Sequence, residues 1–125
     1  MGDDPGKKKI FLIDDEAFFH GIATSLLSDR YNVLAAKSGK EALVLLLKSK
    51  PDLILLDIMM PEMDGWETFH KIRGISLLQD VPIAFITSLS EAEAFEEAKR
   101  LGAVDFFTKP LVAKDFLKRI DKILK

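Results

Sequence analysis

Five short apolar runs alternate with five amphipathic stretches, and this alternation constrains the fold more than any other feature of the chain. The runs lie at residues 10–13, 31–36, 53–56, 82–86 and 103–108. Short apolar runs of this kind are typical of strands that are buried on both faces of a sheet. A helical pattern follows each run, which indicates successive β-then-α units. The sequence therefore predicts an α/β fold, a doubly wound five-stranded parallel sheet with helices on both faces.

Two serines are expected to cap helices. Ser38 and Ser90 each precede a helical stripe, and each has a glutamate three residues later, Glu41 and Glu93, in the capping-box arrangement. In the helix after Ser90, Phe95 is expected to face inward, because it lies on the same predicted stripe as two smaller apolar residues.

Composition limits the classes of protein to which the chain can belong. It has 125 residues, with 18 basic and 20 acidic side chains and a net charge of −2. Residues 8–125 are expected to form one domain, preceded by a flexible N-terminal tail at residues 1–7.

The near-neutral charge argues against nucleic-acid binding, and no apolar run reaches the roughly 18 residues that span a bilayer. The absence of cysteine excludes a disulfide framework and a cysteine nucleophile. No signal peptide is evident, so a cytoplasmic location is expected.

Polar side chains follow four of the five predicted strands. The first strand runs into Asp14, Asp15 and Glu16, the third into Asp57, the fourth into Thr87 and the fifth into Lys109. In open parallel α/β sheets, ligands bind at the carboxyl ends of the strands, so these side chains are expected to meet at one edge.

Carboxylates that meet at one edge repel one another. Two unit charges at about 4 Å repel by about 4 kcal/mol at an effective dielectric constant of about 20. A hard divalent cation offsets this repulsion, and Mg²⁺ binds to carboxylates, water and phosphate oxygens. Lys109 and the Thr87 hydroxyl complete a set of groups suited to a transferring phosphoryl group. Asp57 is the candidate nucleophile, since carboxylates form aspartyl-phosphate intermediates.

The chain resembles the receiver domains of two-component response regulators, the CheY-like superfamily. Four pieces carry the resemblance: Asp14-Asp15, the segment LDIMMPEMDG at residues 56–65, Thr87 followed by Ser88, and GAVDFFTKP at residues 102–110. The match covers residues 8–125. It implies the (βα)5 flavodoxin-like topology with strand order 2-1-3-4-5.

The resemblance implies a role for each acidic residue of the site. Asp57 is expected to accept the phosphoryl group from the phosphohistidine of a histidine kinase. Asp15 and Asp57 are expected to bind Mg²⁺ directly, together with the backbone carbonyl of Met59, and Mn²⁺ or Ca²⁺ can substitute. Asp14 is expected to bind the cation mostly through water.

The resemblance also implies a conformational switch. Lys109 is expected to contact the phosphoryl oxygens, and the Lys109-Pro110 peptide bond is expected to be cis. Thr87 is expected to shift toward the phosphoryl group while Phe106 turns inward. Position 106 is often Tyr in the family, so a Phe here leaves the switch to packing alone.

The implied function is that of a signalling phosphoacceptor that catalyses only its own phosphorylation and dephosphorylation. The implied phosphoryl donor is a sensor histidine kinase or a histidine phosphotransfer protein, and an exposed Phe18 is a candidate contact for it. The other implied partner is an output domain or protein that the sequence does not name.

Neither nucleic acid nor a membrane is expected to bind the chain directly. It is expected to be a monomer or a phosphorylation-dependent homodimer. Val104 stands where many DNA-binding members carry Asp, which lowers the expectation of a dimer although Asp105 and Arg119 are present.

Three alternatives fit the sequence less well than this interpretation. A haloacid-dehalogenase-like phosphatase also uses an aspartate nucleophile, but it needs an Asp at the position of Met59 and an acidic pair after the lysine. A flavodoxin-like module would place a phosphate loop where Asp14, Asp15 and Glu16 stand. A receiver that has lost its chemistry is disfavoured by the intact set of site residues.

Overall fold

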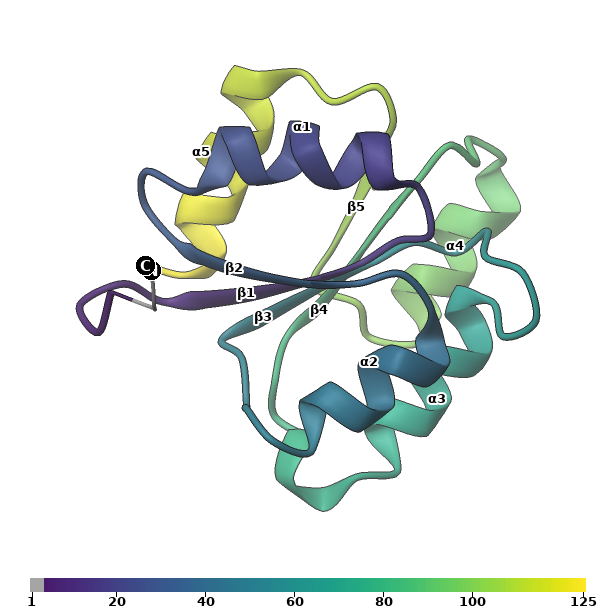
Figure 1. Ribbon diagram of the computed structural model, residues 1–125. Coiled ribbons are helices and arrows are strands. Elements are labelled where there is room, and N and C mark those ends of the chain that lie inside the picture. Colours follow the sequence, from purple (N-terminus) through teal and green to yellow (C-terminus); the bar gives the residue numbers. More distant parts are fainter. Residues whose placement is uncertain (1–3) are drawn as a thin grey trace.

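A five-stranded parallel sheet forms the centre of the computed structural model, which describes residues 4–125 (Figure 1). The strand order is β2-β1-β3-β4-β5, so both the predicted fold class and the predicted order are confirmed. The strands are β1 (Lys9–Ile13), β2 (Asn32–Ala36), β3 (Leu53–Leu56), β4 (Ile83–Thr87) and β5 (Asp105–Thr108).

Helices cover both faces of this sheet. Figure 1 places α1 and α5 on one face and α2, α3 and α4 on the other. The α-helices are α1 (Ala17–Leu27), α2 (Gly39–Leu46), α3 (Gly65–Arg73), α4 (Ala92–Arg100) and α5 (Ala113–Ile123), and a short 3₁₀ helix, η1 (Ser76–Leu78), follows α3.

Two hydrophobic cores separate along the strands because successive side chains point to opposite faces. In β1, Ile10 and Leu12 pack under α1 and α5, while Phe11 and Ile13 pack under α2 and α3. All four side chains are buried. The continuous apolar run of this strand therefore serves both layers, as expected for a strand in the middle of a parallel sheet.

Three strands begin later than predicted. The Tyr31 amide bonds to the Leu27 carbonyl at 2.9 Å and so closes α1 instead of opening β2. The Ala103 amide bonds to the Ala98 carbonyl at 3.0 Å, which ends α4 before β5 starts. Pro82 has no amide hydrogen to donate, and β4 begins after it.

One of the two predicted helix caps is confirmed. The Ser38 hydroxyl accepts from the Glu41 amide at 3.0 Å. Ser90 does not cap α4: the N-cap residue is Glu91, without a side-chain hydrogen bond. The prediction that Phe95 faces inward was also wrong, because it is 47% exposed while Ala94 and Ala98 form the buried face of α4.

The predicted flexible tail at residues 1–7 begins outside the described residues. Residues 4–7 form a turn in which the Lys7 amide bonds to the Asp4 carbonyl at 3.0 Å. The Asp4 amide and carbonyl bond to the Asn32 side chain at 3.0 and 2.7 Å. This turn is therefore in contact with the start of β2. Within residues 4–125 no helix combines the length and apolar character needed to cross a bilayer.

Candidate functional site

Four of the predicted site residues lie at the carboxyl edge of the sheet. Asp14, Asp57 and Lys109 directly follow β1, β3 and β5, and Thr87 is the last residue of β4. Asp14, Asp57 and Thr87 are buried. The Lys109 amide donates to the Thr87 carbonyl at 2.8 Å, which ties two of these strand ends together.

Lys109 is the centre of the charge arrangement. Its Nζ lies 2.7 Å from Asp14 Oδ2, 2.7 Å from Glu16 Oε1 and 3.4 Å from Asp57 Oδ2. It also lies 4.3 Å from the centre of the Phe19 ring. Burial opposes the charged form of Lys109, but the surrounding carboxylates outweigh it and hold the pKa of the ammonium above its ordinary value. Lys109 is therefore a permanent positive charge, only 12% exposed, among three carboxylates.

Asp14 is held in place by its neighbours. Its amide bonds to the Ala36 carbonyl at 3.1 Å, its Oδ1 accepts from the Glu16 amide at 2.9 Å, and its carbonyl is in contact with the His20 ring. The other carboxylate atom, Oδ2, is buried and forms an ion pair with the Lys109 ammonium, 2.7 Å away. The buried Asp14 charge is therefore compensated by Lys109.

The Asp57 carboxyl group is buried, and its pKa is raised. Burial raises its pKa above the ordinary value, and the charge of Asp14 raises it further. The charge of Lys109, the Thr87 hydroxyl and the Met59 amide act in the opposite direction, the amide donating to Oδ1 at 3.2 Å. The carboxyl group is thus placed where an ionised oxygen is poorly solvated but close to a fixed positive charge.

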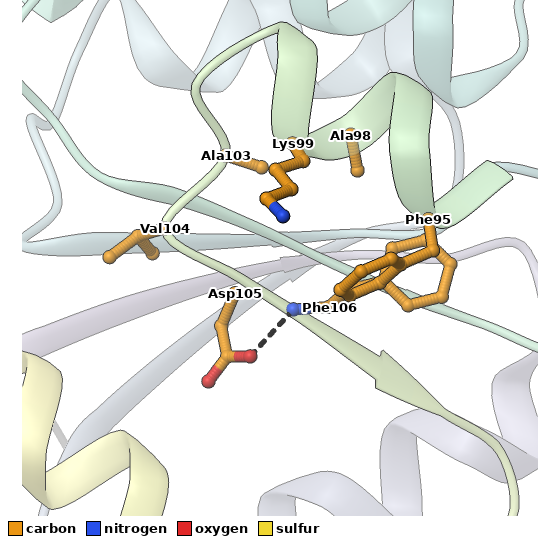
Figure 2. A pocket seen from close by; sticks show the side chains of 7 residues that line it. All are labelled: Phe95, Ala98, Lys99, Ala103, Val104, Asp105 and Phe106. Atoms are coloured by element: carbon orange, nitrogen blue, oxygen red, sulfur yellow. Dashed lines mark hydrogen bonds between the residues drawn. The ribbon is translucent and has the colours of Figure 1, made fainter. Parts of the chain in front are cut away.

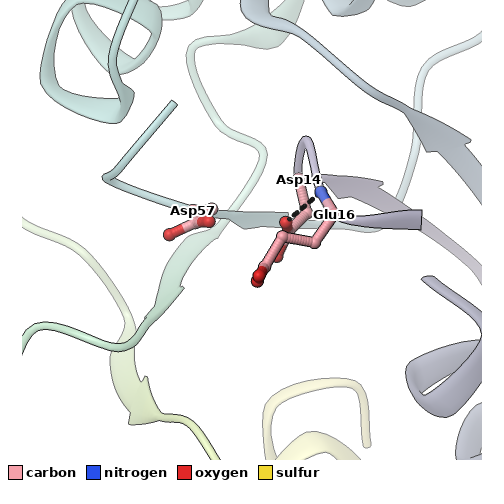
Figure 3. Close-up of side chains that lie close together, drawn as sticks. All are labelled: Asp14, Glu16 and Asp57. Atoms are coloured by element: carbon pink, nitrogen blue, oxygen red, sulfur yellow. Dashed lines mark hydrogen bonds between the residues drawn. The ribbon is translucent and has the colours of Figure 1, made fainter. Parts of the chain in front are cut away.

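The acidic cluster consists of Asp14, Glu16 and Asp57, each with a carboxylate oxygen within 4.8 Å of the others (Figure 3). Such a set of oxygen donors fits a hard divalent cation. Asp15, the predicted direct ligand, is exposed and is not part of this cluster. Its role as a ligand stays a prediction.

Glu16 was predicted to lie at this edge of the sheet but was given no role in the site. The chain bends at Asp15, and the Glu16 amide donates to Asp14 Oδ1 at 2.9 Å across this bend. The Asp14 and Glu16 carboxylates each lie 2.7 Å from Lys109 Nζ. This arrangement depends on the bend, which the sequence pattern did not predict.

The remaining predicted positions are also in place. Met59 lies in the loop after Asp57 with its side chain 54% exposed, and its sulfur is 3.8 Å from the Ser88 hydroxyl. The Lys109-Pro110 peptide bond is cis, as predicted. Phe18 is 82% exposed on α1, also as predicted.

Phe106 lies beside a cavity of about 180 Å³ between α4 and β5 (Figure 2). Its ring meets the Phe95 ring edge to face, with 5.8 Å between the centroids. Its amide donates to the Asp105 carboxylate at 2.8 Å. The half-buried Phe106 ring therefore borders open volume and contacts the Phe95 ring, which lines the same cavity.

Arg119, a predicted charge of the dimer face, is engaged within the chain. It pairs with the Asp105 carboxylate, donates to the Phe106 carbonyl at 3.1 Å and pairs with Asp115 at 3.0 Å. A dimer that used Arg119 across an interface would have to share or replace these contacts.

Gly65 allows α3 to approach the backbone of Asp57 and Ile58. Asp64 caps α3 by accepting from the Glu67 amide at 3.0 Å, and the Gly65 amide donates to the Ile58 carbonyl at 2.8 Å. A Cβ added at Gly65 would lie 2.3 Å from the Asp57 carbonyl oxygen and 2.6 Å from Ile58 Cα. Glycine is therefore required here for space.

Gly65→Ala is expected to destabilise the fold by about 2–3 kcal/mol, because only backbone atoms could move to relieve the clash. Gly21→Ala in α1 is the matched control, since nothing lies within 4 Å of a Cβ at that position. The control is expected to gain about 0.5–1 kcal/mol from its better helix propensity. Urea unfolding of both variants measures this, and equal stabilities would contradict the steric role of Gly65.

Comparison with known proteins points to one family. A family model described as "Response regulator receiver domain" matches residues 10–121. The chemotaxis protein CheY4 of Vibrio cholerae superposes with a TM-score of 0.87 at 29% identity, covering 94% of this chain and 99% of that one.

Longer proteins contain a similar segment. "Probable transcriptional regulator ycf27" of Porphyridium aerugineum is 38% identical over 120 residues, which is 95% of this chain and 49% of the relative. "Histidine kinase P4" of Formosa agariphila is 34% identical over 119 residues, again 95% of this chain but 9% of the relative. The chain thus spans about half the length of the first relative and a small part of the second.

Proposed function

The chain belongs to the response regulator receiver domain family, a signalling family, and on that premise we propose that it accepts a phosphoryl group on Asp57 from the phosphohistidine of a histidine kinase or a histidine phosphotransfer protein. The observation that carries the proposal is the position of the Asp57 carboxyl. It is buried after β3, 3.4 Å from the Lys109 ammonium, and it belongs to the acidic cluster.

The transfer is a displacement at phosphorus. An oxygen of the Asp57 carboxylate forms the new P–O bond while the P–N bond to the donor imidazole breaks, and the departing nitrogen keeps the electron pair and takes up a proton. Lys109 compensates the negative charge on the phosphoryl oxygens, and the Thr87 hydroxyl donates a hydrogen bond to them. These roles need no proton from Asp57, which reacts in its ionised form.

Mg²⁺ is the cofactor that fits this site best, and Mn²⁺ or Ca²⁺ can substitute. Asp14 and Asp57 supply the buried carboxylates, with Asp15 and the Met59 carbonyl as the predicted additional ligands. When bound, the cation neutralises charge on the carboxylates and on the phosphoryl oxygens. The carboxylate oxygens of the acidic cluster, which lie within 4.8 Å of one another, support a cation here.

Thr87 and Phe106 form the proposed switch. Phosphorylation adds negative charge beside Thr87, and a shift of its hydroxyl toward that charge leaves room behind it for the Phe106 ring. The half-buried ring and the adjoining cavity of about 180 Å³ support this proposal. The phenyl ring has no hydroxyl, so packing alone separates the two states.

The proposed partners follow from the family and from the longer relatives. A histidine kinase or a phosphotransfer protein supplies the phosphoryl group, with Phe18 as a candidate contact. The output is a further domain or a separate protein, and the chain acts as a monomer or a phosphorylation-dependent homodimer.

The cytoplasmic location expected from the sequence stays a prediction. The haloacid-dehalogenase alternative has no support from the comparisons, which match the receiver family.

Labelling of the chain by acetyl phosphate is expected to require a divalent cation. Intact-mass measurements should detect one phosphoryl group in Mg²⁺ and none in EDTA.

Asp15→Ala is expected to weaken Mg²⁺ binding by at least about tenfold if Asp15 turns inward as a ligand. Titration followed by the fluorescence of Trp66, which packs 4.9 Å from the Phe85 ring, measures the affinity.

Two results would count against this proposal. Equal labelling in EDTA and Mg²⁺ would contradict the requirement for a cation. An unchanged affinity in Asp15→Ala would remove Asp15 from the ligand set and leave the acidic cluster as the site. Asp29→Asn is the control, since Asp29 is exposed on the turn between α1 and β2, at the amino end of that strand and so away from the carboxyl edge of the sheet.

A further inference from the structure

We infer that Glu16 is a positioning residue, which holds the Lys109 ammonium in the resting site and competes for it with a phosphoryl group on Asp57. The competition rests on the proposed function, whereas the contact between Glu16 and Lys109 is a property of the chain before any reaction.

The distances place Lys109 closer to Glu16 than to the nucleophile. The Lys109 Nζ donates to Glu16 Oε1 at 2.7 Å, against 3.4 Å to Asp57 Oδ2. The same Nζ is 2.7 Å from Asp14 Oδ2. In the resting site the ammonium is therefore held mainly by the two residues that come from the β1–α1 loop.

Glu16 and Asp14 approach Lys109 from different environments. The Asp14 carboxylate is fully buried, and moving the lysine away from it would leave a buried charge unpaired. The Glu16 side chain is 61% exposed, so water can replace the ammonium there at little cost. Glu16 is therefore the partner that Lys109 can exchange.

Glu16 and a phosphoryl group on Asp57 compete for the Lys109 ammonium because both carry negative charge. A phosphoryl group on Asp57 brings additional negative charge to the least closely paired side of the ammonium, and Lys109 must move toward it to make close contacts. The Glu16 carboxylate opposes this movement and also repels an anionic phosphoryl donor at the mouth of the site. Removing it should make phosphorylation faster.

Two variants of Glu16 separate the contact from the charge. Glu16→Gln removes the charge, and Glu16→Asp keeps it on a side chain one methylene shorter, which withdraws it from Lys109. Glu96→Gln is the matched control, because Glu96 is exposed on α4 and is not among the carboxylates that pair with Lys109. All are compared with the wild type as the full 125-residue chain.

The first measurement needs no phosphorylation. In metal-free buffer, the NMR signals of the Lys109 Cε methylene, assigned with a Lys109→Arg variant, should show two distinct protons in the wild type and in Glu96→Gln. In both Glu16 variants these protons should move toward one averaged signal. Unchanged signals in both variants would overturn the inference.

The second measurement is the initial rate of labelling by acetyl phosphate in saturating Mg²⁺. Glu16→Gln is expected to be at least about threefold faster than the wild type. Glu16→Asp is expected to be faster by a smaller factor. If Glu16→Gln is labelled faster but Glu16→Asp is labelled at the wild-type rate, then the charge of Glu16 alone affects the reaction. That result would overturn the proposed competition for Lys109. If the wild type takes up no phosphoryl group while the Lys109 signals change as expected, the proposed function fails and the contact stands.

Discussion

Asp57→Asn is expected to abolish phosphorylation of the chain by a cognate histidine kinase and by acetyl phosphate, a loss of at least about a hundredfold because a neutral amide is a poor nucleophile. The measurement is intact mass after incubation with the donor in Mg²⁺. The amide keeps the shape of the buried side chain, so the loss would reflect chemistry and not packing.

The fold of the Asp57→Asn variant is expected to be retained or strengthened. Burial and the Asp14 charge raise the pKa of Asp57, which means that its ionised form is disfavoured in the folded chain. Replacing it by an amide should therefore leave the free energy of unfolding at neutral pH unchanged or raise it. Asp29→Asn, on an exposed turn, is the control and should be labelled normally. Normal labelling of Asp57→Asn would end the assignment of Asp57 as the acceptor.

Lys109→Met is expected to destabilise the metal-free chain by about 3 kcal/mol at neutral pH, because it leaves buried carboxylates without their nearby cation. Asp14 is fully buried and Asp57 nearly so, and neither has another basic side chain within 4 Å among the described residues. Urea unfolding in EDTA measures the loss. Addition of Mg²⁺ should recover part of it, since the cation would replace the missing charge.

The loss of stability in Lys109→Met should shrink as the pH falls. The pKa of Asp57 is raised by burial and by Asp14, and it rises further once Lys109 no longer opposes these effects. A carboxyl group with a raised folded pKa stabilises the fold below its unfolded pKa, and this contribution is lost as the pH rises through the folded pKa. Acidification from neutral pH toward the ordinary carboxyl pKa, near about 4, therefore favours the folded variant relative to the wild type.

Lys118→Met on the exposed side of α5 is the control for this comparison, and it should change stability by less than about 0.5 kcal/mol at either pH. If the deficit of Lys109→Met were the same at both pH values, or larger in acid, the buried carboxylates could not be its cause.

The sequence pattern predicted strands and helices correctly where one interaction, such as burial of an apolar strand or a side-chain helix cap, determines the element. The apolar runs of β1 and β3 are buried on both sides, and Ser38 caps α2 through its own hydroxyl. The pattern failed at α4, where Ser90 and Glu91 compete for the cap and the helix begins one residue later than Ser90 requires. Phe95 then lies off the buried face, because that face is occupied by Ala94 and Ala98.

The candidate site was predictable where it depends on strand ends. Asp14, Asp57 and Lys109 follow buried strands, and parallel strands bring their carboxyl ends to one edge whatever the loops do. Whether Asp15 or Glu16 faces Lys109 depends instead on the backbone after β1. The chain bends at Asp15, and Glu16, not Asp15, contacts the lysine.

The sequence by itself determined the α/β class and the residues that meet at the functional edge, because apolar periodicity and strand ends are encoded locally. Only the tertiary structure decided how Lys109 divides its contacts among Asp14, Glu16 and Asp57 and which side of Phe106 borders a cavity. Those outcomes depend on how separate loops and helices pack over the sheet. An ammonium group takes the carboxylates that this packing brings within reach, and residue spacing along the chain does not specify that choice.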